Sequence, residues 1–152
     1  MFTPDETAGI VDLFGALTPA EADEALSELA YRRGEDPPEG TIDDALEAFA
    51  LVALETDDGR LLAPGPGAFP ELPEGSEDLP HILGTDGRSV GREAVGRAAA
   101  TRLREEADRT VAAGDTERAA ELIEISYDIE AWNGPDLSAL RERLGTVADN
   151  TK

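Results

Sequence analysis

Thr3-Pro4-Asp5-Glu6 and Thr18-Pro19-Ala20-Glu21 are the stretches of sequence that decide the fold of the N-terminal part. In both, a threonine precedes a proline and an acid follows three residues after the threonine, which is the pattern of a capping box at a helix start. Apolar residues recur with helical period after each stretch, and Gly34 then supplies a stop signal. The pattern predicts one helix from Thr3 to about Ala16 and another from Thr18 to Arg33.

A third helix and a β-hairpin are expected next. Thr41 is in position to cap a helix whose apolar positions are Ile42, Ala45, Leu46, Phe49 and Ala50. Residues 51–55 and 60–63 have the composition of two short strands, and the Asp57-Asp58-Gly59 turn between them is a strong hairpin signal. Three helices followed by a two-stranded ribbon is the order of elements in a winged-helix domain.

Prolines and glycines dominate the segment that follows the hairpin. The density of these residues from Pro64 to Pro80 excludes a helix or a central strand. Phe69, Leu72 and Leu79 are spaced along this segment. They predict an extended strap that lies over the core through those three side chains, and a free linker is the alternative.

The C-terminal part is expected to be helical again. Apolar residues recur every four positions from Ser89 to Ala113, and Gly114-Asp115 supplies a stop followed by a cap for a second arm over 116–132. A last short helix is expected after the break at 133–136. The predicted fold class is mainly α: a winged-helix-like domain at 1–63, a Pro/Gly-rich strap or linker at 64–87, and a helical hairpin at 88–150 that packs on the first part.

The charge of the chain indicates its environment. The sequence has 34 acidic and 13 basic residues, a formal net charge of -21, and Lys152 as its single lysine. Self-repulsion of such a surface destabilises a compact state at low salt, but at about 1 M salt the Debye length falls to about 3 Å and the penalty nearly vanishes. A 40% apolar content with helical period argues against an acidic disordered tail. We therefore expect a folded halophilic protein.

Several classes of site are excluded or not indicated. The absence of cysteine excludes disulfides, thiolate metal sites and thiol nucleophiles, and a single histidine, His81, excludes a histidine pair. No serine lies in a nucleophile-elbow sequence, so His81 is expected to pack or cap. No secretory signal and no apolar window of about 18 residues is present. We expect a cytoplasmic protein, not in a membrane, that is not an enzyme and has no cofactor.

A winged-helix transcriptional regulator that binds DNA is the alternative to a protein-interaction or regulatory module. Its nucleic-acid contacts would come from Arg32, Arg33 and Arg60, the basic residues among the first 80 positions, which hold 20 acids. Such a surface repels phosphate. Counterion release adds little affinity in molar salt, so a DNA-binding protein in that environment need not be basic overall. This reading requires the three arginines to converge on a surface clear of carboxylates.

Residues 88–109 are the one segment that is not acidic, with six arginines against four acids. These arginines could bind an acidic partner, a nucleic-acid backbone or the acidic half of the chain itself, or they could pair locally at helical spacing. An exposed large aromatic residue would be the best partner contact; the set is Tyr31, Phe49, Phe69, Tyr127 and Trp132. The candidate partner-binding residues are Arg88, Arg92, Arg97, Arg104 and Trp132.

Several segments resemble a family of small haloarchaeal proteins of unknown function. They are the opening Met1-Phe2-Thr3-Pro4-Asp5-Glu6, residues 11–18 and 26–34, Pro64-Gly65-Pro66 with Phe69-Pro70, and residues 77–83. The resemblance spans nearly the whole chain and implies a haloarchaeal origin and no particular activity. The function expected from the sequence is a non-catalytic protein-interaction or regulatory module, with a protein partner or a second copy of the chain as its ligand.

Overall fold

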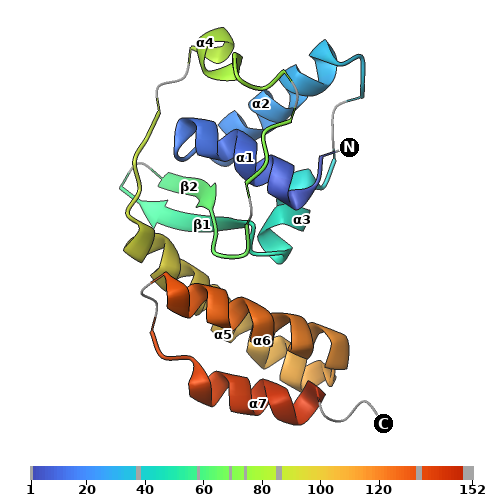
Figure 1. Ribbon diagram of the computed structural model, residues 1–152, viewed down its shortest axis with the longest axis vertical. Helices are drawn as coiled ribbons and strands as arrows, with labels where there is room; N and C mark the ends of the chain where they lie inside the picture. Colours follow the sequence, from blue (N-terminus) through green and yellow to red (C-terminus); the bar gives the residue numbers. More distant parts are fainter. Residues whose placement is uncertain are drawn as a thin grey trace. The chain divides into compact units, whose positions relative to one another are not determined.

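The structure is a computed structural model that describes residues 2–36, 39–57, 59–68, 70–73, 75–84, 87–132 and 135–148. The predicted positions Phe69 and Asp58, and the side chain of His81, lie outside this description. The chain divides into two compact units, Met1–Gly91 and Arg92–Lys152. The described residues are mainly helical with one two-stranded antiparallel sheet, which confirms the predicted fold class at this level (Figure 1).

Both predicted capping boxes are formed. Helix α1 is Pro4–Phe14 and α2 is Pro19–Arg32. The hydroxyl of Thr3 accepts a hydrogen bond from the Glu6 N–H at 3.0 Å, and the Glu6 carboxylate accepts one from the Thr3 N–H at 3.0 Å. The same reciprocal pair joins Thr18 and Glu21. Helix α1 ends before the predicted Ala16 because Gly15 has a positive φ of 83°.

Helix α3 (Thr41–Glu47) corrects one predicted cap. The N-cap residue is Gly40, in the left-handed region, and it makes no side-chain cap hydrogen bond. Thr41 is instead the first helical residue, 5% exposed, and its hydroxyl has no hydrogen-bond partner among the described residues. The helix also stops short of Phe49, which has a positive φ of 58° and a fully buried side chain.

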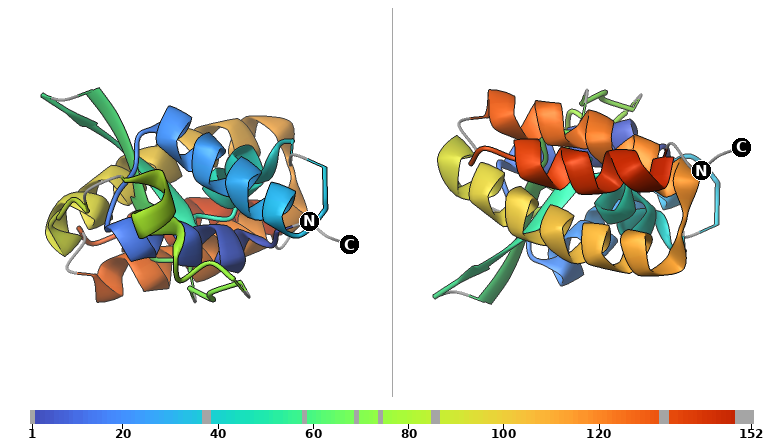
Figure 2. Two further views of the ribbon diagram at one scale, coloured as in Figure 1. Left: turned by 90° about the horizontal axis from the view of Figure 1, so that it is seen from above. Right: turned by 90° about the horizontal axis from the view of Figure 1, so that it is seen from below.

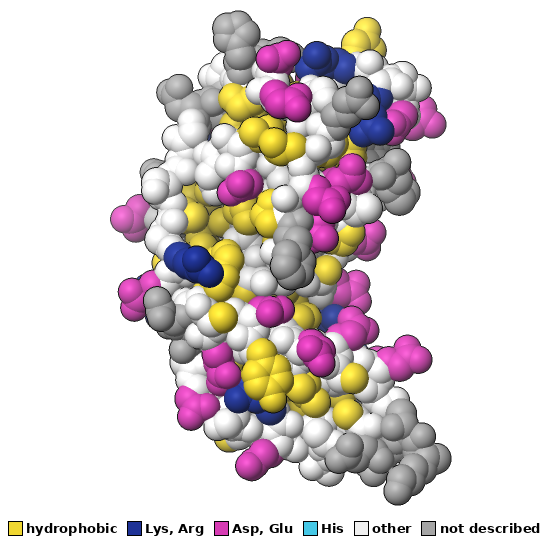
Figure 3. Space-filling view, in the orientation of Figure 1, with side chains coloured by type: hydrophobic (Ala, Val, Ile, Leu, Met, Phe, Trp, Pro, Cys, Tyr) yellow, Lys and Arg dark blue, Asp and Glu magenta, His cyan; other side chains and the backbone are white. Residues whose placement is uncertain are grey.

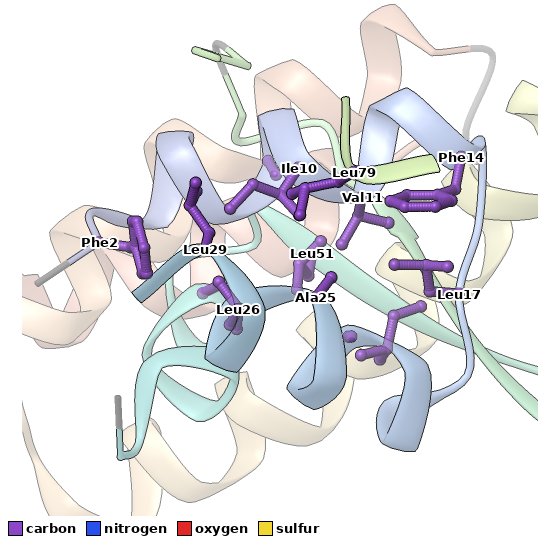
Figure 4. Packing of buried hydrophobic residues seen from close by; sticks show 14 of the residues in the cluster. Phe2, Ile10, Val11, Phe14, Leu17, Ala25, Leu26, Leu29, Leu51 and Leu79 are labelled. Carbon is purple, nitrogen blue, oxygen red and sulfur yellow. The ribbon is translucent and has the colours of Figure 1, made fainter. Parts of the chain in front are cut away.

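The predicted hairpin consists of β1 (Leu51–Thr56) and β2 (Gly59–Pro64), paired antiparallel with Leu54 opposite Leu61. A bridge joins β2 to the connection between α1 and α2 through hydrogen bonds of Leu17 with Leu62. Buried apolar side chains of α1 and α2 point toward one another with Leu51 between them (Figure 4). The core of the first unit therefore lies between these two helices and the hairpin.

The predicted strap passes directly over α1. The Glu71 N–H donates to the Asp5 carbonyl at 3.0 Å, and a Cβ added to Gly9 would overlap the Glu71 carbonyl. Leu79 is fully buried as expected, but Leu72 is 52% exposed and so does not hold the strap to the core. A short helix that was not predicted, α4 (Leu79–Leu83), follows the prolines.

The second unit consists of α5 (Arg92–Ala113), α6 (Thr116–Ala131) and α7 (Ser138–Ala148), which lie side by side (Figure 2, right). The predicted stop and cap between the first two are present, since Gly114 has a positive φ and the Asp115 carboxylate accepts a hydrogen bond from Arg118 N–H. Helix α5 begins at Arg92 instead of the predicted Ser89. Its buried face is rich in small side chains: Val95, Gly96, Ala99, Ala100, Leu103 and Ala107.

Candidate functional site

Two arginines of the predicted DNA-binding surface, Arg32 and Arg33, lie at the end of α2 and the third lies on β2. Two of the three face carboxylates. Arg60, on β2, pairs with Glu55 across the hairpin at 2.8 Å. Arg33, which follows α2, lies 3.3 Å from the Glu35 carboxylate and also lies over the ring of Phe2. Arg32 donates a hydrogen bond to the Gly75 carbonyl at 3.2 Å. The carboxylate-free surface that DNA binding would require is not formed by Arg33 and Arg60.

Arg88 forms part of the first unit's structure. Its guanidinium donates two hydrogen bonds to the Glu21 carboxylate, at 2.6 and 3.2 Å, and a third to the Ala16 carbonyl. Its backbone N–H donates to the Phe14 carbonyl at 2.7 Å. The hydrogen bonds from the Arg88 guanidinium are the main cause that lowers the pKa of Glu21. Arg88 thus ties the segment before α5 to the corner between α1 and α2.

Most arginines of α5 pair locally, which was the alternative expected for this segment. Arg97 lies 3.1 Å from Glu93, and both Arg102 and Arg109 lie within 3.3 Å of Glu106. Arg104 is exposed and makes no ion pair within the described part of the chain. It lines a shallow depression of about 330 Å³ with Arg143, Asp108, Asp136, Leu137 and Leu140.

The four large aromatic candidates that the structure describes lie in distinct environments, and Phe69 lies outside the described residues. Tyr31 is 80% exposed and Tyr127 is 55% exposed, whereas Phe49 is fully buried. Trp132 is half-buried, with the guanidinium of Arg92 lying over its ring at 4.4 Å. Burial of all five together, which would have contradicted a partner contact through an aromatic side chain, is therefore excluded, and the two tyrosines are the exposed aromatic candidates among the described residues.

Tyr127 is held in a network that joins α6 to α7. The guanidinium of Arg141 lies over the ring, 4.2 Å from its centroid. Arg141 also lies 2.9 Å from the Glu130 carboxylate and donates to the hydroxyl of Ser126, a fully buried side chain. Glu130 accepts a further hydrogen bond from the Leu137 N–H at 2.7 Å. The arginine under the ring is therefore fixed from several sides.

The pKa shifts in this network follow from its hydrogen bonds. The Leu137 N–H, with help from Arg141, lowers the pKa of Glu130. Glu130 in turn raises the pKa of Arg141, so both groups of the pair stay charged. The exposed ring of Tyr127 thus contacts the Arg141 guanidinium, and the Glu130 carboxylate balances the charge of that guanidinium.

Two carboxylates flank Tyr127 on α6. Glu124 and Asp128 are four residues apart and exposed, and neither makes an ion pair with any basic residue that the structure describes. Partial burial, and then repulsion by Glu124, raise the pKa of Asp128. We call the surface formed by Glu124, Tyr127, Asp128 and Arg141 the tyrosine face. Hydrophobic side chains gather on one side of the second unit next to basic ones, with acidic ones around them (Figure 3).

Comparison with protein-family models places residues 5–149 in a family of unknown function, DUF7109. The chain belongs to the DUF7109 family. Comparisons with curated proteins and with solved structures gave no match. The prediction of a family of unknown function is confirmed, and the haloarchaeal origin stays a prediction.

Neither a metal site nor a membrane span is found in the described part of this DUF7109 member. No three histidine, cysteine or acidic side chains among the described residues are grouped to hold a metal ion. A depression of about 470 Å³ between α2 and α3 is lined by Asp23, Glu39 and Asp43. No helix within the described ranges has both the length and the apolar character to cross a membrane.

Sequence reasoning did not identify the residues that brace Tyr127. Arg141 on α7 reaches Ser126 and Glu130 on α6 across the break between the two helices, and no helical spacing relates the arginine to those two residues. Glu21 was recognised only as a helix cap, because its partner Arg88 is 67 residues away. Tyr127 itself was found from its side-chain type, since large aromatics are enriched in interface hot spots.

Proposed function

We propose that this DUF7109 member is a non-catalytic protein-interaction module of a halophilic cytoplasm, and that it binds its partner through the tyrosine face. The observation that carries the proposal is the contrast between its arginines and its aromatic rings. Arg33, Arg60, Arg88 and Arg97 face carboxylates of their own unit. The ring of Tyr127, by contrast, is exposed on a fixed support.

A fixed aromatic ring suits recognition in molar salt. Recognition between exposed charges weakens there because the Debye length is only about 3 Å at 1 M. Burial of an aromatic side chain does not depend on long-range charge, and tyrosine and arginine are enriched among residues that dominate binding energy. Because Arg141 already holds the ring, less side-chain freedom is lost when a partner covers it.

DNA binding is less well supported by the described residues than protein binding. Three helices followed by a hairpin is an order that suits a winged-helix-like scaffold, but a fold does not determine a function. Arg33 and Arg60 are occupied by Glu35 and Glu55, and the surrounding residues are acidic. We therefore propose a protein partner in preference to nucleic acid, and a different protein in preference to a second copy carrying the same charge of -21.

The test is a quantitative pull-down from lysate of the source organism, kept in molar KCl. Three baits are compared: the natural chain, Tyr127→Ala, and Tyr31→Ala as an exposed tyrosine without such a support. We expect a stoichiometric protein that is lost with Tyr127→Ala and kept with Tyr31→Ala. Equal recovery with all three baits would contradict the proposal, and so would nucleic acid as the main ligand, measured from the same beads.

A further inference from the structure

We infer that the tyrosine face accepts an arginine or lysine side chain of the partner, seated on the open side of the Tyr127 ring beside Glu124 and Asp128. This inference rests on the proposed function and adds the chemistry of the partner. Its basis is an exposed aromatic ring, already occupied on one side, next to two carboxylates that have no basic partner in the described part of the chain.

The ring offers a surface that attracts a cation. Arg141 lies over one side of Tyr127, and 55% of the residue is still exposed. The face of an aromatic ring carries negative charge density, so a guanidinium or ammonium group is attracted to it. Arg141 does not oppose a second cation strongly, because the Glu130 carboxylate lies 2.9 Å from its guanidinium.

The carboxylates beside the ring also favour a cation. Like charges four residues apart on a helix repel each other. Burial first, and then repulsion by Glu124, raise the pKa of Asp128. Elsewhere in the second unit, Glu93, Glu106 and Glu121 each have an arginine three or four residues away within 3.3 Å. A basic side chain from a partner would form with Glu124 and Asp128 the ion pair that those glutamates form with arginines of their own chain.

The partner is a different protein with a basic segment. A second copy of this chain carries the same net charge of -21, and most of its described arginines already face carboxylates. A cation held between a ring and two carboxylates is in close contact with them, so salt screens it less than it screens separated surface charges.

Helix α2 contains a matched control for this site. Glu24 and Glu28 have the same spacing as Glu124 and Asp128, and neither makes an ion pair among the described residues. Ser27 occupies the place that corresponds to Tyr127. The two helices therefore present the same carboxylate spacing, with an arginine-supported ring beside the pair in α6 and with only the exposed Tyr31, three residues after Glu28, in α2.

The experiment is an NMR titration of the isotope-labelled full chain in molar KCl. The probes are the capped tripeptide Gly-Arg-Gly and its citrulline analogue, which has nearly the same shape without the charge. We expect the arginine peptide to shift the amides of residues 124–128 in a saturable way, and those of 24–28 much less. Replacement of Tyr127 by serine is expected to weaken binding by about two- to fivefold. Equal shifts with citrulline, equal shifts at both helices, or no shift at 124–128 would overturn the inference.

A second measurement separates this inference from the function on which it rests. The pull-down is repeated with the double variant Glu124→Gln and Asp128→Asn, which removes both charges and keeps the side-chain shapes. Loss of the partner with this variant and with Tyr127→Ala supports the inference. Retention with the double variant and loss with Tyr127→Ala overturns the basic-partner inference and leaves the interaction function standing. Retention with both variants contradicts the proposed function as well.

Discussion

In the first unit, backbone hydrogen bonds tie several distant segments together alongside the side-chain bonds of Arg32 and Arg88, whereas in the second unit the polar contacts between the described helices join arginines to carboxylates and aromatic rings. Backbone hydrogen bonds tie Leu17 to Leu62, Glu71 to Asp5, and Arg88 to Phe14. Among the described residues of the second unit, the polar contacts between separate helices are made by side chains, such as Arg143 with Asp108 and Arg141 with Glu130.

This difference shows what each unit tolerates. Close backbone contacts require glycine at the crossing points, so the first unit is sensitive to added volume there. The backbone groups of the helices in the second unit form their hydrogen bonds within each helix. The surface side chains between these helices can therefore contribute to recognition as well as to packing. Substitutions at glycine should therefore affect the stability of the two units in opposite ways.

The largest expected effect is that of Gly15→Ala in the first unit. Gly15 has a φ of 83°, and an added Cβ would overlap the Arg88 carbonyl. Both the strained backbone and the overlap must be relieved, so we expect a loss of about 3 kcal/mol or more in the free energy of unfolding. Denaturant unfolding in molar KCl, followed by far-UV circular dichroism, measures this loss.

Gly145→Ala in α7 is the matched change in the second unit. An added Cβ would meet nothing within 4 Å there, and alanine favours a helix interior over glycine by about 1 kcal/mol. The fluorescence of Trp132, the single tryptophan, reports on that unit. A gain of stability from Gly15→Ala, or a large loss from Gly145→Ala, would contradict the proposed difference between the units in their sensitivity to added side-chain volume at glycine.

The sequence predicted the parts of the fold that depend on neighbours along the chain. The capping boxes at Thr3 and Thr18 are confirmed because their partners lie three residues away. The prediction that Thr41 caps a helix is wrong. Its side-chain type suits a cap, but Gly40 is the N-cap residue, in a left-handed conformation. The helix after the strap contains Leu79, which is buried in the core with residues of α1 and α2, and local pattern does not report that packing.

The candidate site was predictable only in part for the same reason. Tyr127 could be named as an exposed aromatic candidate from its type, but its support by Arg141 depends on how α7 returns beside α6. The arginines of residues 88–109 were recognised as a cluster, and the pairing at helical spacing that most of them show was the stated alternative. Arg88 could not be assigned in advance, because Glu21 belongs to a different part of the sequence.

The next largest effect is expected from Arg88→Met, which removes the charge that binds Glu21 and keeps much of the side chain. The pair is about one-third exposed, so solvent screening limits the expected loss to about 1 kcal/mol. Hydrogen exchange of the α1 and α2 amides measures it. Arg60→Met is the control, since the pair of Arg60 with Glu55 is mostly exposed. If Arg60→Met lost as much stability as Arg88→Met, the role of Arg88 in holding its segment to the corner between α1 and α2 would be contradicted.

The same pair makes the first unit sensitive to acid. Arg88 lowers the folded pKa of Glu21 below its ordinary value of 4.5. The stabilisation is therefore present above pH 4.5 and is lost as the pH falls through the lower folded pKa. The stability difference between the natural chain and Arg88→Met should shrink over that range. A difference that stays constant through strong acid would show that the variant acts through packing and not through the charge of Glu21.

A smaller effect, of opposite sign, is expected from Thr41→Val. The Thr41 hydroxyl is buried without a hydrogen-bond partner in the described part of the chain, so its replacement by a methyl group should raise stability by up to about 1 kcal/mol. Thr7→Val is the matched control, because the buried Thr7 hydroxyl donates to the Thr3 carbonyl at 2.9 Å. We expect that control to lose stability in the same unfolding measurement.

The smallest effect on stability is expected at the tyrosines, and it sharpens the comparison between the units most directly. Tyr127→Ser removes the ring over Arg141 and should cost about 0.5 to 1 kcal/mol, whereas Tyr31, 80% exposed, should be replaceable at almost no cost. Trp132 fluorescence during denaturant unfolding measures the first change, and circular dichroism the second. If Tyr127→Ser lowers partner binding far more than it lowers stability, the ring serves recognition; equal losses would show that it mainly holds α7 to α6.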